Sequence, residues 1–481
     1  MQSICRQYAL DKKPLPVLST HTHPQPPLQK ADFGPEFVWG TATAAFQIEG
    51  AVDRDGRTPS IWDTFSRQPG KIKTGDTADL ACLFYDHYEA DLQLHKTLGF
   101  THFRFSLSWS RILPMGVGPG QGGVVNEAGL AFYDRLIDRC LALGITPWIT
   151  LYHWDLPQAL EDRGGWRNRQ VVEWFGAFAD VCTRAFGHKV KHWIILNEPL
   201  AFSVLGYCTG QHAPGRRGIW GLLPVIHHVA LAQAEGGRVV RQNVAGAEVG
   251  TTFSCSPVEP FTASVRDAGA ARRVDALMNR LFIEPALGLG YPVADLPFLK
   301  GIAQKYTLPG DTERLAFDFD FVGLQHYFRA VVEHTYFMPY LWAREVTPLR
   351  RQVPQLTEMG WEVYPESMYR ILKQFAQYEG VRKLYISESG AAFYDRLVKG
   401  VVDDPARIQY HQDYLLQTRR ARSEGVPVEG YFVWTFLDNF EWAEGFRPRF
   451  GLVYVDFRTQ ARIVKASGHW FSRLLNSTRP L

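Results

Sequence analysis

From Glu36 onward, the chain alternates between two patterns of hydrophobic positions. The first is a short, nearly continuous apolar run rich in β-branched and aromatic residues, which is typical of a parallel strand buried on both faces. Such runs predict eight strands, at residues 37–43, 101–109, 146–154, 192–199, 248–256, 319–328, 383–390 and 428–439.

The second pattern places apolar residues about 3.6 positions apart, as expected for helices that bury one face. It predicts helices over residues 79–98 and 171–186, and a third that starts after Asn126 as N-cap and ends near Gly144. Eight strand–helix repeats predict a single (β/α)8 TIM barrel of the α/β class. No shift in composition marks a second domain, so we expect this barrel to span residues 33–481.

Residues 1–32 have a different character, because five prolines fall between positions 14 and 27. This segment is predicted to be a disordered, Pro-rich leader. Its first ten residues have no apolar signal region, and no stretch of the chain approaches 18 consecutive apolar residues, so we expect no membrane span. A transit peptide is the alternative for the leader, since acidic residues are few there.

Charge and cysteine usage narrow the choice of partners and compartment. The 52 basic and 49 acidic residues are interspersed and give a net charge of +3, without the basic stripe of a nucleic-acid surface. The six cysteines form no CxxC pair and no zinc-like spacing with histidine, which predicts reduced thiols, a cytoplasmic location and no metal site.

In TIM barrels, catalytic groups lie at the C-terminal ends of the strands. The predicted strand ends carry amides, carboxylates, a histidine, an arginine and tryptophans, namely Gln47, Glu49, Arg104, His153, Asp155, Asn197, Glu198, Gln325, His326, Tyr327, Glu388, Trp434, Asp438, Asn439, Glu441 and Trp442. Such amides and carboxylates can bind sugar hydroxyls, and Trp faces can stack on a sugar ring.

Two of these groups, Glu198 and Glu388, suggest glycoside hydrolysis, which needs one carboxylic acid to protonate the leaving oxygen and a second carboxylate. A separation of about 5–5.5 Å between them would predict retention of configuration through a glycosyl-enzyme ester. Spacing alone leaves aldolases, metal hydrolases and other barrel enzymes open. It also leaves open a buried ion pair for Arg104 and a core position for His153.

Six longer motifs resemble glycoside hydrolase family 1, the β-glucosidase family, and the resemblance covers about residues 33–475. These motifs are residues 37–50, 103–114, 152–157, 196–199, 359–365 and 434–442. The resemblance implies that Glu198 is the general acid/base and Glu388 the nucleophile. It implies no cofactor, because the protein supplies both groups.

The resemblance also implies sugar-binding roles. Asn197 is expected at the 2-hydroxyl; Gln47, His153, Glu441 and Trp442 at the other hydroxyls; Trp434 as the floor of the glycone site; Trp361 in the aglycone site; and Phe450 near the 6-position. Arg104 and Tyr327 are expected to hydrogen-bond the nucleophile.

Two positions depart from the family pattern. Gln325 stands where the family has asparagine, and Ser389 follows the nucleophile where the family has asparagine. Because a displacement of about 1 Å can cost about 10²-fold in rate, we expect these changes to slow the enzyme or shift its pH optimum. Glu198 argues against the thioglucosidases, which have glutamine there, and Glu441 argues against a 6-phosphorylated sugar.

The sequence thus predicts a retaining β-glucosidase that acts on terminal non-reducing β-D-glucosyl residues, with β-galactosyl and β-fucosyl side activities. Its partner is expected to be a small β-glycoside or a cello-oligosaccharide. A transglycosidase of the same family and a sugar-binding pseudoenzyme are the alternatives. The exposed-looking aromatics Tyr336, Phe337, Tyr340 and Trp342 could form an aglycone wall or a contact surface, and the sequence does not fix the oligomeric state.

Overall fold

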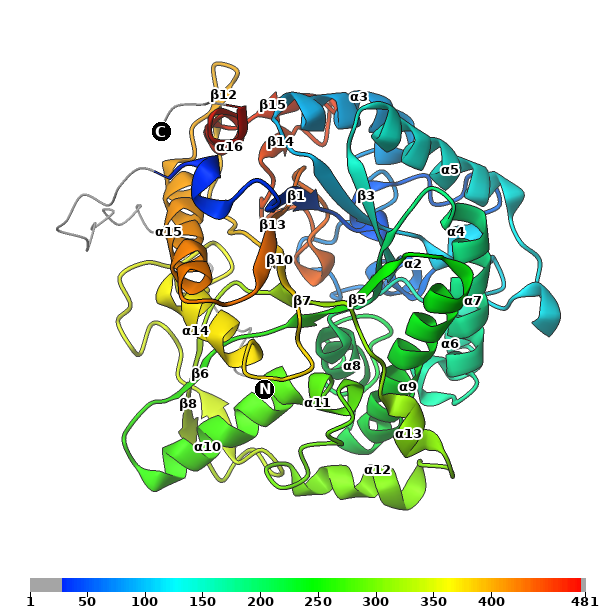
Figure 1. Ribbon diagram of the computed structural model, residues 1–481, viewed down its shortest axis with the longest axis vertical. Helices are drawn as coiled ribbons and strands as arrows, with labels where there is room; N and C mark the ends of the chain where they lie inside the picture. Colours follow the sequence, from blue (N-terminus) through cyan, green and yellow to red (C-terminus); the bar gives the residue numbers. More distant parts are fainter. Residues whose placement is uncertain (1–27, 477–481) are drawn as a thin grey trace.

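The computed structural model describes residues 28–476 and contains the predicted closed barrel (Figure 1). Eight parallel strands are joined in the order β1-β13-β10-β7-β5-β4-β3-β2. They are β1 (Val38–Ala42), β2 (His102–Ser106), β3 (Thr146–Tyr152), β4 (His192–Asn197), β5 (Glu248–Ser254), β7 (Phe321–Gln325), β10 (Leu384–Ser389) and β13 (Val428–Trp434). All eight predicted strands are therefore confirmed.

The interior of the barrel is packed with large rings that meet across it. The ring of Trp148 lies 4.9 Å from Tyr385, 5.1 Å from Phe432 and 5.3 Å from Phe321, centroid to centroid. Glycines make room for these rings, since a Cβ atom at Gly40 would come within 2.4 Å of the Phe432 ring. This packed layer closes the barrel below the strand ends, so a ligand can be bound only at the mouth.

Helices surround the barrel (Figure 1). The three predicted helices are present as α3 (Phe84–Thr97), α5 (Glu127–Ala142) and α7 (Val171–Phe186). Helix α3 begins five residues later than predicted, because Leu83 adopts a left-handed conformation with φ of 49°. Asn126 is the N-cap residue of α5, but its side chain makes no capping bond and donates instead to the carbonyls of Asp55 and Arg111.

Helix α1 (Ala45–Ile48) follows β1 directly. The helices that follow the later strands include α8 (Pro199–Tyr207), α9 (Ile219–Asn243), α10 (Val265–Asp275), α12 (Lys300–Lys305), α13 (Asp311–Leu315), α14 (Glu366–Phe375), α15 (Pro405–Ser423) and α16 (Ala466–Asn476). Within residues 28–476, no helix is long and apolar enough to cross a membrane.

Three small sheets lie outside the barrel. Strands β6 (Val258–Pro260), β8 (Ala330–His334) and β9 (Ala343–Glu345) form one sheet. The others are hairpins, β11 (Leu397–Val398) with β12 (Val401–Val402), and β14 (Val453–Val455) with β15 (Arg462–Val464). Strand β13 ends at Trp434, earlier than predicted, because the chain then leaves the barrel and Asp438 donates its backbone N–H to the carbonyl of Val453.

The predicted leader over residues 1–32 falls mostly outside the described residues. Its last part is ordered: Leu28 is buried, and Lys30–Phe33 forms a 3-10 helix. Arg419 of α15 pairs with Asp32 over 2.8 Å, which fastens this segment to the helix layer. The disorder predicted for residues 28–32 is therefore wrong, because these residues pack against the barrel.

Candidate active site

Glu388, in β10 at the mouth, is held by donors from three other positions. Its Oε1 accepts from Arg104 Nη1 over 2.6 Å and from Gln325 Nε2 over 3.0 Å, and its Oε2 accepts from the Tyr327 hydroxyl over 2.7 Å. The side chains of Arg104 and Glu388 are 0% and 5% exposed. A buried cation and two neutral donors thus converge on this carboxylate and fix its orientation.

Asn197, the last residue of β4, lies at the centre of the same network. Its Oδ1 accepts from Arg104 Nη2, from Gln325 Nε2 over 2.5 Å and from Thr252 Oγ1 over 3.2 Å. Its Nδ2 lies 2.9 Å from Nε2 of His153, which burial and the charge of Arg104 keep neutral by holding its pKa well below the usual value. These contacts use both polar atoms of the Asn197 side chain and hold its amide in one orientation.

Glu198 follows directly and sits in a different environment. Its backbone is left-handed, with φ of 47°, and Pro199 starts α8 immediately after it. Such a conformation costs a non-glycine residue roughly 1–3 kcal/mol and persists only where the surrounding structure enforces it. Burial, followed by the charge of Glu388, raises the pKa of Glu198 well above its ordinary value, although Arg104 and Ser254 act in the opposite direction. Burial and the nearby Glu388 therefore favour the protonated form of Glu198.

A third carboxyl group, Glu441, is positioned by the loop that follows β13. Gln47 Nε2, from α1, donates to the Phe440 carbonyl over 2.8 Å, to Asn439 Oδ1 over 3.2 Å and to Glu441 Oε2 over 3.4 Å. Burial, with the charges of Glu388 and Glu444, raises the pKa of Glu441 to about 8. The Oε1 atom of Gln47 and the Nδ1 atom of His153 are buried and have no hydrogen-bond partner among the described residues.

Aromatic rings line two sides of this cluster of polar side chains. On one side, Trp442 packs against Trp154 at 4.5 Å and against His153 at 5.8 Å, and Trp434 lies 6.0 Å from His153. On the other side, Trp361 contacts Tyr327 at 5.3 Å and Phe450 at 6.1 Å, centroid to centroid. The predicted site residues therefore come together at one mouth, although they lie as much as 403 positions apart in the sequence.

The two departures from the family pattern differ in their surroundings. Gln325 faces Glu388 and Asn197, as given above, so its longer side chain still reaches both. Ser389 faces the other way: its Oγ lies 3.4 Å from the hydroxyl of Tyr410 in α15. His326 also faces the helix layer, where its Nε2 lies 2.7 Å from Ser367 Oγ in α14. The serine that replaces the family's asparagine at position 389 therefore affects a contact with α15, on the side of β10 that faces away from the mouth.

Two threonines complete the network and were not predicted from the sequence. Thr150 Oγ1 accepts from Arg104 Nε over 3.1 Å, and Thr252 Oγ1 accepts from Gln325 Nε2 over 2.9 Å. Both lie in strands, where threonine is common because it is β-branched. The sequence therefore contained no signal to separate these residues from ordinary strand positions.

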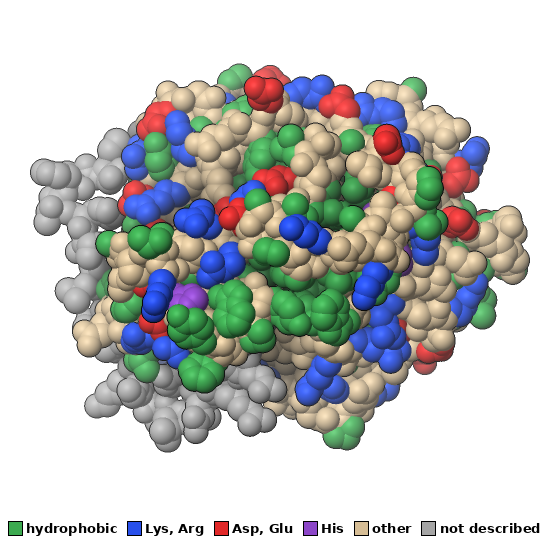
Figure 2. Space-filling model, turned by 90° about the horizontal axis from the view of Figure 1, so that it is seen from below, with side chains coloured by type: hydrophobic (Ala, Val, Ile, Leu, Met, Phe, Trp, Pro, Cys, Tyr) green, Lys and Arg blue, Asp and Glu red, His purple; other side chains and the backbone are tan. Residues whose placement is uncertain are grey.

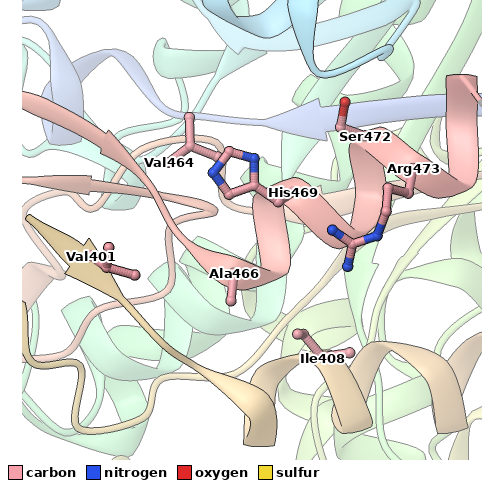
Figure 3. A pocket seen from close by; sticks show the side chains of 7 residues that line it. All are labelled: Val401, Ile408, Val464, Ala466, His469, Ser472 and Arg473. Atoms are coloured by element: carbon pink, nitrogen blue, oxygen red, sulfur yellow. The ribbon is translucent and has the colours of Figure 1, made fainter.

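A depression in the surface lies away from the mouth (Figure 3). It has a volume of about 400 Å³ and is lined by Val401, Ile408, Val464, Ala466, His469, Ser472 and Arg473. It holds no carboxylate, so the paired acid chemistry of the mouth is not available there. Among residues 28–476, no group of three or more His, Cys, Asp or Glu side chains is arranged to hold a metal ion.

The barrel and its carboxylate-lined mouth define a glycoside hydrolase, and comparison with known proteins gives the family. The sequence of residues 29–479 matches the glycosyl hydrolase family 1 profile. A 1,4-beta-D-glucan glucohydrolase of Thermotoga neapolitana is 42% identical over 443 residues, covering 92% of this chain and 97% of that protein. Beta-glucosidase A of Thermotoga maritima is 42% identical over 444 residues, with the same coverage.

Solved structures give the same answer. The family 1 β-glucosidase from Thermotoga maritima superposes with a TM-score of 0.87 at 42% identity, covering 92% of this chain and 98% of that chain. The same enzyme in complex with deoxynojirimycin also gives a TM-score of 0.87. The protein belongs to glycosyl hydrolase family 1.

Proposed function

We propose that this protein is a retaining β-glucosidase in which Glu388 is the nucleophile and Glu198 the general acid/base. The observation that carries the proposal is the contrast between the two carboxyl groups. Three donors, one of them a cation, hydrogen-bond Glu388, whereas burial and the charge of Glu388 raise the pKa of Glu198. Glycoside hydrolysis by double displacement needs two carboxyl groups in such different environments, one as nucleophile and one as acid.

The reaction would proceed in two displacements. Glu388 attacks the anomeric carbon while Glu198 donates its proton to the leaving oxygen, and a glycosyl ester forms. Ester formation neutralises Glu388, which removes the charge that raises the pKa of Glu198. The ionised Glu198 then takes a proton from water, which attacks the same anomeric carbon and releases Glu388. Two inversions give retention of configuration.

The glycone would be a single β-D-glucosyl unit bound by the polar groups at the mouth. Gln47, His153, Asn197 and Glu441 supply acceptors and donors for its hydroxyls, and buried Gln47 Oε1 and His153 Nδ1 have no partner among the described residues. Buried polar groups are normally paired, so this unused capacity supports a polyhydroxylated ligand. The rings of Trp434 and Trp442 support the apolar face of the sugar.

The leaving group would be a short β-linked gluco-oligosaccharide. The relative from Thermotoga neapolitana is named a 1,4-beta-D-glucan glucohydrolase. In this chain, several aromatic side chains are exposed in segments that follow the mouth ends of β4 and β7, and we call them the aromatic band: Trp220, Tyr336, Phe337, Tyr340 and Trp342. Figure 2 shows hydrophobic side chains gathered among Lys and Arg on the side formed by α10 and α12.

The test is turnover of p-nitrophenyl β-glycosides by the wild type, Glu198→Gln and Glu388→Gln. We expect the glucoside to be cleaved with β-glucose as the first product seen by NMR. Incubation with a 2-deoxy-2-fluoro-β-glucosyl fluoride should add one fluoroglucosyl mass to the peptide that contains Glu388. Label on another residue would refute the assignment of the nucleophile, and α-glucose as the first product would refute retention.

Glu198→Gln provides a separate test of the acid. It should lose most activity on glycosides with poor leaving groups but retain labelling of Glu388 by an activated fluoride, because fluoride departs without protonation. Equal loss on both substrates would contradict the role of Glu198. A folded wild type that cleaves no glycoside would contradict the proposed function as a whole.

A further inference from the structure

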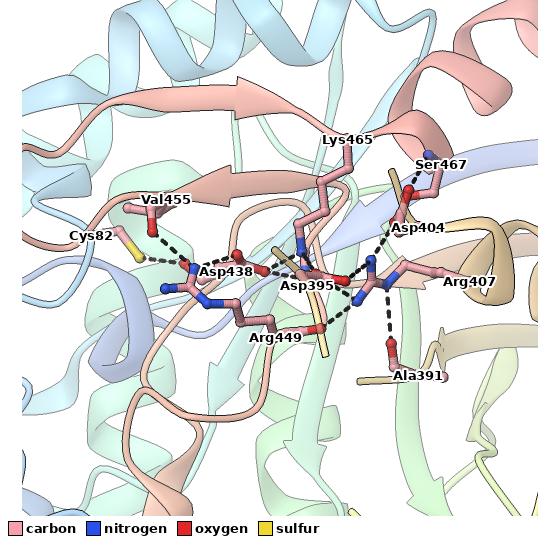
Figure 4. Close-up of polar contacts among 11 residues, drawn as sticks. Cys82, Ala391, Asp395, Asp404, Arg407, Asp438, Arg449, Val455, Lys465 and Ser467 are labelled. Atoms are coloured by element: carbon pink, nitrogen blue, oxygen red, sulfur yellow. Dashed lines mark hydrogen bonds and ion pairs between the residues drawn. The ribbon is translucent and has the colours of Figure 1, made fainter. Parts of the chain in front are cut away.

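Six charged side chains form a buried network behind the mouth, which we call the interloop network: Asp395, Asp404, Arg407, Asp438, Arg449 and Lys465 (Figure 4). Lys465 Nζ lies between two aspartates, 2.5 Å from Asp395 Oδ2 and 2.6 Å from Asp438 Oδ1. Arg449 Nη1 donates to the other oxygen of Asp438 over 2.7 Å. The three acids are thus matched by three bases.

On the Asp395 side, Arg407 completes the network. Its Nη2 pairs with Asp395 Oδ2 over 2.9 Å and also donates to the backbone carbonyl of Arg449 over 2.6 Å. Asp404 binds Arg407 and accepts from the backbone N–H of Ser467 over 2.7 Å. Figure 4 shows Arg407 and Arg449 at opposite ends, with Lys465 between them.

The network is almost entirely removed from water. The side chains of Lys465, Arg407 and Asp438 are 0% exposed, and only Arg449 reaches the surface, at 17%. Taking charges out of water costs about as much as their mutual attraction returns, so a buried ion network adds little stability compared with an apolar core. The network instead fixes positions, because each ion pair holds together the two segments that carry its partners.

The segments that it joins are those that carry the proposed catalytic and sugar-binding groups. Asp395 belongs to the loop that follows β10 and Glu388, while Asp438 lies three residues before Glu441. Arg449 immediately precedes Phe450, whose ring contacts Tyr327 at 6.3 Å. Tyr327 in turn donates to Glu388. The network therefore spans the distance between the glycone-recognition loop and the strand that carries the proposed nucleophile.

We propose that the interloop network is a positioning device that sets Glu441 and Phe450 at the correct place relative to Glu388, with Lys465 and Arg449 as its positioning residues. This inference rests on the proposed function. Neither residue touches the sugar. They act through Asp438 and the loop 438–450. Their loss should therefore weaken binding of the sugar more than it slows the chemical step.

The experiment compares Arg449→Met and Arg449→Lys with the wild type on p-nitrophenyl β-glucoside and β-fucoside. Arg449 lies at the edge of the network, so its variants leave the pair of Lys465 and Asp438 intact. We expect Arg449→Met to raise KM for the glucoside about tenfold with a smaller fall in kcat, because misplacement of binding groups weakens their contacts. The fucoside lacks the 6-hydroxyl and should be affected less. Arg449→Lys should recover most of the loss.

Arg169→Met is the matched control. Arg169, 33% exposed, pairs over 2.5 Å with Asp311, 1% exposed, beside α7, α9 and α13. This pair therefore also joins a partly exposed arginine to a buried aspartate, far from the loop 438–450. We expect Arg169→Met to lower the melting temperature as much as Arg449→Met does, without changing KM or the glucoside-to-fucoside ratio.

A second variant removes charges from the centre of the network in balance. Lys465→Met combined with Asp438→Asn eliminates one base and one acid, and should change the glucoside-to-fucoside ratio in the same direction as Arg449→Met. If both variants keep the wild-type KM and ratio, the inference is wrong and the network is only structural. Failure of the wild type to cleave either substrate would instead contradict the proposed function.

Discussion

Gln325 donates from Nε2 to Oε1 of Glu388 over 3.0 Å, although its side chain is one methylene longer than the asparagine expected from the family. The same nitrogen lies 2.5 Å from Asn197 Oδ1 and 2.9 Å from Thr252 Oγ1. A single amide therefore joins the proposed nucleophile to the residue beside the proposed acid. The longer side chain of Gln325 therefore reaches both Glu388 and Asn197.

Replacement of Gln325 tests this relationship. We expect Gln325→Asn to lower kcat about tenfold, because a shorter amide on the same backbone moves away from Glu388 by about 1 Å and such displacements cost up to about 10²-fold. Ser389→Ala, beside Glu388 but facing Tyr410, serves as the control and should change kcat less than threefold, roughly the effect of losing one weak neutral hydrogen bond. A faster Gln325→Asn enzyme would show that glutamine limits the rate.

Loss of Arg104 should be far more damaging. Arg104→Met leaves the buried Glu388 without its cation. Removal of one partner of a buried pair costs about 3–5 kcal/mol, and a loss of that size in transition-state stabilisation would lower kcat/KM roughly 10²- to 4 × 10³-fold. Arg111→Met is a matched control, because Arg111 is also 0% exposed and pairs with Glu49 over 3.1 Å. It should lower the melting temperature but keep kcat/KM within about threefold. Equal activity losses in the two variants would argue against a specific role for Arg104.

The raised pKa of Glu441 predicts a pH-dependent stability. In the unfolded chain this carboxyl ionises near 4.5, whereas burial and the charges of Glu388 and Glu444 raise its pKa in the folded protein to about 8. The folded state therefore binds the extra proton between these values, and the unfolding free energy contributed by Glu441 falls as pH rises, by about 1.4 kcal/mol per pH unit.

Urea unfolding of the wild type and Glu441→Gln from pH 4 to pH 9 would measure this effect. The variant lacks the titration, so its stability advantage should be smallest near pH 4, grow up to about pH 8 and then level off. The prediction would be wrong if the difference between the two proteins stayed constant across this range.

The aromatic band predicts a dependence on substrate length. Trp220 and Tyr340 are 58% and 40% exposed, and their ring centroids lie 6.0 Å apart. Truncation of either to alanine should lower kcat/KM for cellotetraose about three- to tenfold, the size of one aromatic stacking contact, and leave p-nitrophenyl β-glucoside unchanged. Leu141→Ala removes an exposed apolar side chain near the C-terminal end of α5 and should affect neither substrate.

Sedimentation of the same variants separates the two interpretations of the band. A sugar platform predicts that the wild type and the variants have the same mass in solution. A wild-type dimer that becomes monomeric in Trp220→Ala, with unchanged kinetics on cellotetraose, would identify the band as a contact surface between two copies.

The sequence by itself determined the architecture, and it predicted the paired carboxyl groups. Each strand of the barrel is a local apolar run, so the eight strands could be found from consecutive residues, and the barrel topology then placed Glu198 and Glu388 at one mouth. The motif resemblance supplied the family, which the comparisons confirm. Local signals fail at element ends, as at Leu83, where the backbone conformation delays the start of α3.

Tertiary structure alone decided how the site is held. Hydrogen bonds from Thr252 to Asn197, and from Lys465 to Asp438, join residues that are 55 and 27 positions apart, and no local pattern records them. It also decided that Gln325 faces Glu388 while Ser389 faces Tyr410. Successive side chains of any strand point to opposite faces, but only the closed barrel decides what each face meets. The hydrogen-bond partner of a side chain and the direction in which it points depend on packing, and packing exists only in the folded chain.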